Sequence, residues 1–354
     1  MKRTFTLLLI IVVVLYAKEA YRTYQSAMYV AEQLTGSLSD ITEEVTAIPL
    51  QPADGHRIDK ARSIRQEGAN LFLISKGVLY RFQHNGDFIC RITNPEDINV
   101  AGYMVDSVKK ELIVLGNQED VFYYDFEGQL IERKKLNSEL PNRQILAMSL
   151  HSNRIWSIEE NSYQDPDTQE IYIEKEVVTY DTSFHKIETR KLVALDLGRP
   201  QFMLGLFEPR LCLDPSSGNP LVHYASPYSE QLPMDTLYLK NSWEKQTATI
   251  WNSGKVPVTP VNPMGRFWIS SYQNMQDDKK NYTFCFDTQT YQYKNIEGGL
   301  RDDFYNTGDV VLEAMDMYNN SYCYIKSGKD IKKAFRDRKE EENAVVFIVK
   351  LKQV

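Results

Sequence analysis

The sequence predicts an all-β fold, a six-bladed β-propeller, carried behind a short N-terminal export segment. Three observations support this prediction: a repeat of about forty to fifty residues, an unassigned strand before the first repeat, and an apolar run at the N-terminus. The composition agrees, because 22 Tyr and 15 Phe occur in short clusters with Val, Ile and Thr, which favour strands. A body of roughly 300 residues can bury a stable core without disulfide bonds.

The repeat is clearest in its first two copies. A shift of 42 residues (128 − 86) places Leu79–Arg91 on Val121–Arg133, so that Gly86 meets Gly128 and Ile89 meets Ile131. Each copy has the pattern strand, turn, strand, polar-glycine turn, strand. The dipeptide Asn85-Gly86 predicts a two-residue hairpin turn in which both residues adopt positive φ.

Later copies are less similar but keep a strand that ends in aspartate. Tyr123-Tyr124-Asp125 is echoed by Tyr180-Asp181 and Phe286-Asp287. Units of this length with about four strands each are typical of propeller blades, whereas a β-solenoid would repeat every 20–30 residues or so. We count six units, at about Ala61–Thr93, Tyr103–Leu136, Gln144–Leu192, Gln201–Trp251, Val258–Ile296 and Asp309–Leu351.

One further strand, Glu44–Leu50, precedes the first unit and belongs to none of them. A ring of blades has to be closed, and this strand is well placed to complete the last blade beside Val345–Leu351. Proline has no N–H to donate to a β-ladder, so Pro49 predicts that the strand lies at the outer edge of that blade.

The N-terminus has the pattern of an export signal. Lys2 and Arg3 precede the apolar run Thr4–Ala17, which as a helix would span about 21 Å, less than the roughly 30 Å of a bilayer core. A small-x-small cleavage site is poor, so an uncleaved inner-membrane anchor stays open as an alternative. The predicted organisation is a signal peptide or anchor (1–20), a polar, partly helical spacer (21–43) and the propeller (44–354), with the body in the periplasm or cell envelope.

Three segments together resemble a known family. They are Ala47–Leu50, the blade Leu71–Ile92 with its turn Asn85–Ile89, and the C-terminal strand Asn343–Lys352. These segments resemble bacterial envelope six-bladed propellers, which are related in shape to NHL-repeat and TolB-like proteins. The resemblance covers about Glu44 to the C-terminus, and it implies the fold and an exported location. It implies no particular activity.

Charge and motifs exclude several classes of function. The net charge is −7 and no basic stripe interleaved with aromatics occurs, which argues against a nucleic-acid partner. The basic run Lys326–Lys339 is interrupted by Asp330 and Asp337, which is typical of a solvated loop or short helix. No catalytic motif such as HExxH, GxSxG or a P-loop is present, so we expect no catalytic residues and no cofactor.

Metal sites and disulfides are not indicated either. The acidic segment Asp165–Glu170 lacks the glycine and ligand spacing of an EF-hand, and a hairpin loop is the better interpretation. No histidine or cysteine pair has metal-ligand spacing. The four cysteines lie in apolar stretches, which predicts free, buried thiols at Cys90, Cys212, Cys285 and Cys323.

The leading functional hypothesis is an exported, non-catalytic propeller that binds a protein or glycan partner through one loop-lined face. The candidate binding residues, in the fourth and fifth units, are Tyr224, Tyr228, Arg266 and Trp268. For any one of these aromatics, packing between blades is the alternative. Two other functions stay open: a metal-dependent lactonase or esterase with its site in the central channel, and a structural component of the envelope.

Overall fold

The computed structural model describes residues 36–353, apart from short gaps. The gaps are residues 95, 97, 117–119, 137–142, 152, 165, 168–170, 197–209, 214–219, 225–235, 240–244, 248–261, 264, 275–279, 288, 291, 317–320 and 336–342. The predicted signal or anchor (1–20) therefore lies outside the described residues. Among the described residues, neither helix combines the length and apolar character that a bilayer crossing requires.

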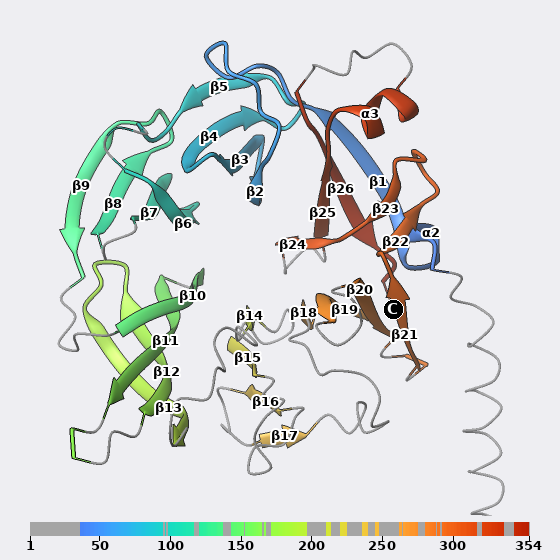
Figure 1. Ribbon diagram of the computed structural model, residues 1–354. Helices are drawn as coiled ribbons and strands as arrows, with labels where there is room; N and C mark the ends of the chain where they lie inside the picture. The colour runs from blue at the N-terminus through green and yellow to red at the C-terminus, as the bar shows by residue number, and fades with distance from the viewer. Residues whose placement is uncertain are drawn as a thin grey trace, which may run out of the picture.

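The first three sheets are antiparallel and four-stranded, and each runs in sequence order from its first to its fourth strand (Figure 1). They correspond to the first three predicted units. Their strands are β2 (Arg62–Glu67), β3 (Asn70–Ser75), β4 (Val78–Gln83) and β5 (Phe88–Arg91); β6 (Val100–Asp106), β7 (Glu111–Gly116), β8 (Asp120–Asp125) and β9 (Leu130–Lys135); and β10 (Arg143–His151), β11 (Arg154–Gln164), β12 (Ile171–Asp181) and β13 (Lys186–Asp196).

Three further four-stranded sheets follow, and the last of them takes its fourth strand from the N-terminus. Their strands are β14 (Arg210–Leu213), β15 (Pro220–Tyr224), β16 (Thr236–Leu239) and β17 (Lys245–Thr247); β18 (Asn262–Pro263), β19 (Phe267–Asn274), β20 (Lys280–Asp287) and β21 (Gln292–Glu297); and β24 (Glu313–Asp316), β25 (Ser321–Lys326), β26 (Val345–Leu351) and β1 (Thr42–Pro49).

The sheets stand around a common axis, with their first strands next to one another on the inside (Figure 1). Among the described residues, buried side chains fill the spaces between the first and second sheets, between the second and third, and on both sides of the last sheet. This arrangement is a β-propeller, so the predicted all-β propeller is confirmed. Five sheets are full blades with middle strands of six or more residues, whereas β14–β17 is a small sheet of strands three to five residues long.

The N-terminal strand closes the ring, as predicted. β1 pairs antiparallel with β26, with Val45 opposite Val349 and Ile48 opposite Val346. β1 has β26 as its one neighbour in the sheet, so Pro49 lies on an outermost strand, where its missing N–H costs no ladder bond. The prediction that Glu44–Leu50 completes the last blade is therefore confirmed.

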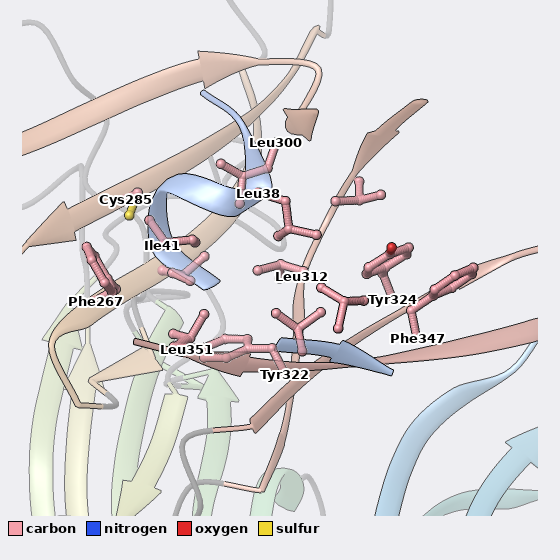
Figure 2. Packing of buried hydrophobic residues seen from close by; sticks show 14 of the residues in the cluster. Leu38, Ile41, Phe267, Cys285, Leu300, Leu312, Tyr322, Tyr324, Phe347 and Leu351 are labelled. Atoms are coloured by element: carbon pink, nitrogen blue, oxygen red, sulfur yellow. The ribbon is translucent and has the colours of Figure 1, made fainter. Parts of the chain in front are cut away.

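A short helix and a hairpin outside the blades hold β1 in place. The helix α2 (Leu38–Ile41) precedes β1, and the hairpin of β22 (Leu300–Asp302) and β23 (Gly308–Val310) precedes β24. The Arg301 N–H donates to the Gly36 carbonyl at 2.8 Å, and Lys352 Nζ donates to the Ser39 carbonyl at 2.8 Å. Figure 2 shows side chains of α2 and of the last two blades in one buried cluster, in which Leu38, Ile41, Phe267, Cys285, Tyr322 and Leu351 are labelled.

The repeated turn differs from the prediction. In the first blade it has three residues, because the Gln83 N–H donates to the Asp87 carbonyl at 2.8 Å and Gly86 N–H donates to the Gln83 carbonyl at 2.9 Å. Gly86 has a φ of 93°, but Asn85 is not among the residues with positive φ. The predicted two-residue turn was wrong because His84 also belongs to the turn, which places the left-handed conformation at the glycine alone.

The repeated aspartate has a structural role in these turns. Asp125 Oδ1 accepts a hydrogen bond from the Gln129 N–H at 2.7 Å, and Asp181 Oδ1 accepts one from the His185 N–H at 2.9 Å. In the fifth unit, Asp287 Oδ1 likewise accepts from the Gln289 N–H at 2.9 Å. The carboxylate accepts a hydrogen bond from a turn N–H that the β-ladder leaves unpaired. This role explains why aspartate recurs at the end of these strands.

The remaining predictions about loops agree with the structure where it describes them, and the prediction of free, buried thiols is wrong in its burial at Cys90. The segment Asp165–Glu170 falls in the hairpin between β11 and β12, with Gln164 opposite Ile171. The basic run contains the helix α3 (Lys329–Ala334). Cys285 and Cys323 are buried and free, whereas Cys90 is free but only half-buried; the side chain of Cys212 lies outside the described residues.

Candidate functional site at the seam

A pocket of about 400 Å³ lies where the last blade meets the first, an interface that we call the seam. Three separate parts of the chain line it: the segment before β2, the end of β23 with the start of β24, and the end of β25. The lining residues are Asp59, Lys60, Ala61, Asp309, Val310, Val311, Glu313, Cys323, Tyr324, Ile325, Lys326 and Ser327.

The segment between β1 and β2, residues 50–61, is held against the last blade by hydrogen bonds. The Ala344 N–H donates to the Ile58 carbonyl at 2.7 Å, and the Ile58 N–H donates to Asn343 Oδ1 at 2.8 Å. Ser75 Oγ donates to the Lys60 carbonyl at 2.6 Å. These bonds set the position of Asp59 and Lys60, so one wall of the pocket depends on ring closure.

Both charge signs are present at the pocket. Lys326 Nζ donates to the Asp309 carbonyl at 2.7 Å and lies 3.9 Å from Asp330 Oδ2. Asp59 Oδ1 lies 3.5 Å from Lys76 Nζ. Burial alone would raise the pKa of Asp59, but Lys76 holds the pKa below its usual range. The carboxylate is therefore ionised at neutral pH, and the pocket suits a polar group that both donates and accepts hydrogen bonds.

The thiol at the pocket does not have the properties of a nucleophile. Cys323 is 1% exposed, and burial raises its pKa to about 12. It is protonated at neutral pH, and the thiolate is the reactive form. Within the described part of the chain, no three His, Cys, Asp or Glu side chains are grouped as metal ligands.

Two arginines on β2 fasten the first blade to both of its neighbours. Arg65 Nη1 donates to the Met315 carbonyl at 2.7 Å and to the Ala314 carbonyl at 3.1 Å, across the seam. Arg62 Nη2 donates to the Val100 carbonyl at 2.8 Å on the other side. Charged donors make strong hydrogen bonds to carbonyls, so the Arg65 contacts help to fix the width of the seam.

The candidate residues Arg266 and Trp268 contact their own blade. Arg266 Nε and Nη2 donate to the two oxygens of Asp287 at 3.0 and 2.7 Å, and the guanidinium lies over the ring of Phe267. The hydrogen bond to Asp287 raises the pKa of Arg266. Burial would raise the pKa of Asp287, but Arg266 brings it below its usual range. Trp268 is half-buried and packs edge-on against Phe286.

Tyr224 and Trp268 lie near opposite ends of the second strands of their sheets. Tyr224 is the last residue of β15, whereas Trp268 is near the start of β19, and both are second strands of their sheets. Their backbones therefore lie toward opposite faces of the ring. The side chain of Tyr224 and all of Tyr228 lie outside the described residues. We call the side where second strands end and first strands begin the pocket face, because Lys326 ends β25 there.

Sequence reasoning missed the seam pocket although it contained the necessary signal. The predicted pairing of Glu44–Leu50 with the last blade already placed the following segment, with Asp59 and Lys60, beside residues of the sixth unit. Charged residues that flank the first and last units would then have been candidates. The aromatic residues that cluster in the sequence lie instead in the fourth and fifth units.

Comparison with known proteins supports the fold. No protein-family model matches the sequence, and no curated protein matches it. Among solved structures, a candidate exported protein of Bacteroides fragilis is similar, with 14% identity over 88% of this chain and 95% of that one and a TM-score of 0.55. BamB from Moraxella catarrhalis matches at 13% identity over 88% and 99%, with a TM-score of 0.42. At 14% identity, the likeness to the Bacteroides fragilis protein concerns the fold alone.

Proposed function

We propose that this chain is an exported, non-catalytic propeller of the cell envelope that binds a protein or glycan partner at the seam pocket. The observation that carries the proposal is the pocket itself, which is assembled from three separate segments and presents both charge signs. Loops on a rigid scaffold are the usual place for binding residues. A carboxylate, an ammonium and several backbone groups can together recognise hydroxyl or amide groups.

The proposal includes a second area on the same face. β15 ends in Tyr224 toward the pocket face, and Tyr228 follows four residues later in the sequence. Tyrosine side chains can supply large contact area at low entropic cost. We assign Arg266 and Trp268 a supporting role within their own blade, because their contacts with Asp287 and Phe286 are internal.

We also propose that the ring has six blades and that the protein is exported to the cell envelope. We propose that the small sheet β14–β17, between β10–β13 and β18–β21 in the chain, is the sixth blade of the ring. Export is supported by the basic and apolar N-terminus, with residues 1–20 as signal or anchor, 21–43 as spacer and 44–354 as propeller. The fold is similar to that of a candidate exported protein, which agrees with this location.

The enzymatic alternative makes a different demand on the channel. A metal-dependent lactonase or esterase needs several carboxylates that converge within coordination distance of one ion. Stoichiometric calcium or zinc in the purified protein, with ester or lactone hydrolysis lost on chelation, would favour that alternative and argue against a binding role. A purely structural role would leave the pocket without a specific partner.

Site-specific photo-crosslinking tests the proposal. A photoreactive amino acid at Val311, which lines the pocket and is 43% exposed, should yield a discrete crosslinked partner in envelope preparations. The matched control is Val108, which is 82% exposed in the turn between β6 and β7 on the other face. Equal crosslinking from both positions, or none from Val311, would contradict binding at the seam.

A further inference from the structure

The segment through which the chain enters the propeller is fixed to the hairpin that precedes β24. Ser37 and Arg301 form an isolated parallel β-bridge. The Arg301 N–H donates to the Gly36 carbonyl at 2.8 Å, and Arg301 Nη2 donates to Ser37 Oγ at 3.0 Å. We call residues 36–41, together with the residues 301–303 that they contact, the strap. The strap holds the chain before β1 begins.

Two aspartates of the strap accept hydrogen bonds from the entering chain. Asp303 Oδ1 accepts from the Ser39 N–H at 3.0 Å, and Asp303 Oδ2 accepts from the Ser39 hydroxyl. Asp40 Oδ2 accepts from the N–H groups of Gly36 and Ser37 at 2.9 and 3.2 Å. Burial alone would raise the pKa of Asp303, but its hydrogen bonds with Ser39 hold the pKa below its usual range. The Asp303 carboxylate is therefore ionised at neutral pH, and hydrogen bonds to a charged acceptor are strong ones.

The strap is also held by the residue that follows β26. Lys352 Nζ donates to the carbonyls of Ser39 and Asp40 at 2.8 and 3.0 Å, and the Lys352 N–H donates to the Ile41 carbonyl at 2.9 Å. Leu38 and Ile41 are 0% exposed and belong to the cluster that they form with the last two blades (Figure 2). Contacts with two separate parts of the chain therefore fix these residues in addition to the apolar core.

The strap lies at the end of the β1–β26 ladder where tension on the entering chain would separate the two strands first. The ladder is antiparallel, with Thr42 opposite Leu351 and Pro49 opposite Val345. Tension on the chain before β1 acts at the Thr42 end, so it would open the ladder one residue pair after another. Each pair contributes few hydrogen bonds, and a ladder that opens in this way resists little force. Because the strap directly precedes Thr42, its contacts must break before the ladder is under tension.

The strap resists local opening more than it stabilises the whole ring. The hydrogen bonds between Ser39 and Asp303 are exposed, and they are a small fraction of the interactions that global unfolding breaks. They are a much larger fraction of the interactions that hold residues 36–41, which can open locally while the blades stay folded. Such contacts have their main effect when force acts on the adjoining chain.

We propose that the strap transfers tension from the N-terminal segment to the last blade, so that residues 1–35 act as a permanent tether between the propeller and a membrane. This inference rests on the exported location in the proposed function, and it selects one of the two forms of that location, an uncleaved anchor at residues 1–20. A propeller released by cleavage carries no tension where its chain enters the ring. The seam pocket is not involved, since a tethered and a released propeller can both bind a partner there.

Force spectroscopy on the full chain in detergent tests the transfer of tension, with handles on tags at the two ends of the chain. At constant force, the wild-type protein should open in one step in which the whole ring unfolds. Asp303→Ala should first extend by about 50 Å, the length of residues 36–49, and this first opening should be about tenfold faster than in the wild type. Asp330→Ala, which removes another exposed aspartate of the sixth unit, is the matched control and should behave as the wild type. The melting temperature of Asp303→Ala should stay close to that of the wild type, because global unfolding breaks many other contacts.

Mass spectrometry of the protein isolated from its host tests the tether itself. We expect the tryptic peptide Thr4–Lys18 in the membrane fraction, since an uncleaved anchor retains it. A protein that begins after residue 20 and lies in the soluble fraction would overturn the proposal, as would a separate 50 Å step, about the length of residues 36–49, in the wild type. Equal opening rates for Asp303→Ala and Asp330→Ala would also overturn it. Crosslinking from Val311 tests the seam pocket separately, so the tether can fail while binding at the pocket stands.

Discussion

The interface between the first two blades and the seam are built from the same repeated turn. Between the first two blades, a Cβ on Gly128 would lie 2.8 Å from the Arg91 carbonyl oxygen of β5. At the seam, a Cβ on Gly86 would lie 2.1 Å from the Pro49 carbonyl oxygen of β1. In both places the turn of one blade packs against the outer strand of the preceding blade. The N-terminal strand therefore substitutes for an outer strand that the last repeat lacks.

The two interfaces differ in what fills the space around this contact. Between the first two blades, Arg81 Nη1 donates to the Phe126 carbonyl at 2.8 Å and the guanidinium lies over the ring of Phe126. At the seam, the segment after β1 crosses to β2 and leaves the pocket beside β25. Repeat residues pack across the regular interface, and a pocket lies at the irregular one. The candidate site therefore lies where the two ends of the propeller chain interrupt the repeat.

The largest expected effect comes from removing the closing strand. Deletion of residues 1–50 should prevent stable folding, because it exposes the edge of β26 and removes the buried Val45, Ile48 and Leu50. Burial of three aliphatic side chains contributes about 5 kcal/mol or more, comparable to the whole stability of many domains. Deletion of residues 1–35 is the control and should leave the melting temperature near that of the longer protein. Equal melting temperatures for both truncations would contradict ring closure by β1.

Three glycines with positive φ provide a graded test of the two interfaces. Gly68→Ala should cost about 1 kcal/mol, since a Cβ there meets nothing within 4 Å and only the left-handed conformation is penalised. Gly128→Ala should cost about 2 kcal/mol and Gly86→Ala about 3 kcal/mol, because backbone oxygens lie in the way. Denaturant unfolding measures the series. A cost for Gly86→Ala no larger than for Gly68→Ala would show that the seam is loosely packed.

Substitution of the two arginines of β2 should destabilise the two interfaces one at a time, with a smaller loss of stability than Gly86→Ala. Arg65→Met should destabilise the seam and Arg62→Met the contact with the second blade, each by about 1.5 kcal/mol, because each substitution removes hydrogen bonds of a charged, part-buried donor. Thiol labelling gives the location: Cys323 at the seam should react faster in Arg65→Met, and Cys90 faster in Arg62→Met. Identical labelling in the two variants would mean that the interfaces are not independent.

The smallest expected effect is a difference in the rates at which the cysteine thiols react with a thiol reagent. Burial raises the pKa of Cys285 and of Cys323 to about 12, above the ordinary value of 9.0, so both remain protonated at pH 8. Neither should react with a thiol reagent in the native protein, whereas the half-buried Cys90 should react slowly. Four thiols should titrate after denaturation without reductant. A count below four would reveal a disulfide, which would have to involve Cys212 or a rearranged pair.

Much of the fold could be predicted because similar turns and strands recur at a regular spacing in the sequence. The match of Gly86 with Gly128 located the turns, since only glycine tolerates both the positive φ and the close approach of a neighbouring carbonyl. Phe184 takes the same position in the third blade with a φ of 62°, and for that reason the third copy was harder to recognise. Pro49 correctly marked an outermost strand.

The candidate site was harder to predict because its parts are far apart in the sequence. Asp59 and Lys326 come together only after β1 has paired with β26, and neither belongs to a motif. The aromatic residues that were singled out have large side chains, which a propeller also needs between its strands. Trp268 fills such a position against Phe286. Residue type alone does not separate these two uses.

Native-state hydrogen exchange tests most directly the claim that β1 is an integral part of the ring and fixes the seam. Amides of β1 and of its partner β26 should exchange with the same free energy and the same dependence on denaturant, equal to global unfolding. The outer strand β5, which the repeat supplies, is the internal comparison. Exchange of β1 at a much lower free energy, with β26 and β5 still protected, would show that the strand detaches locally and would contradict the account.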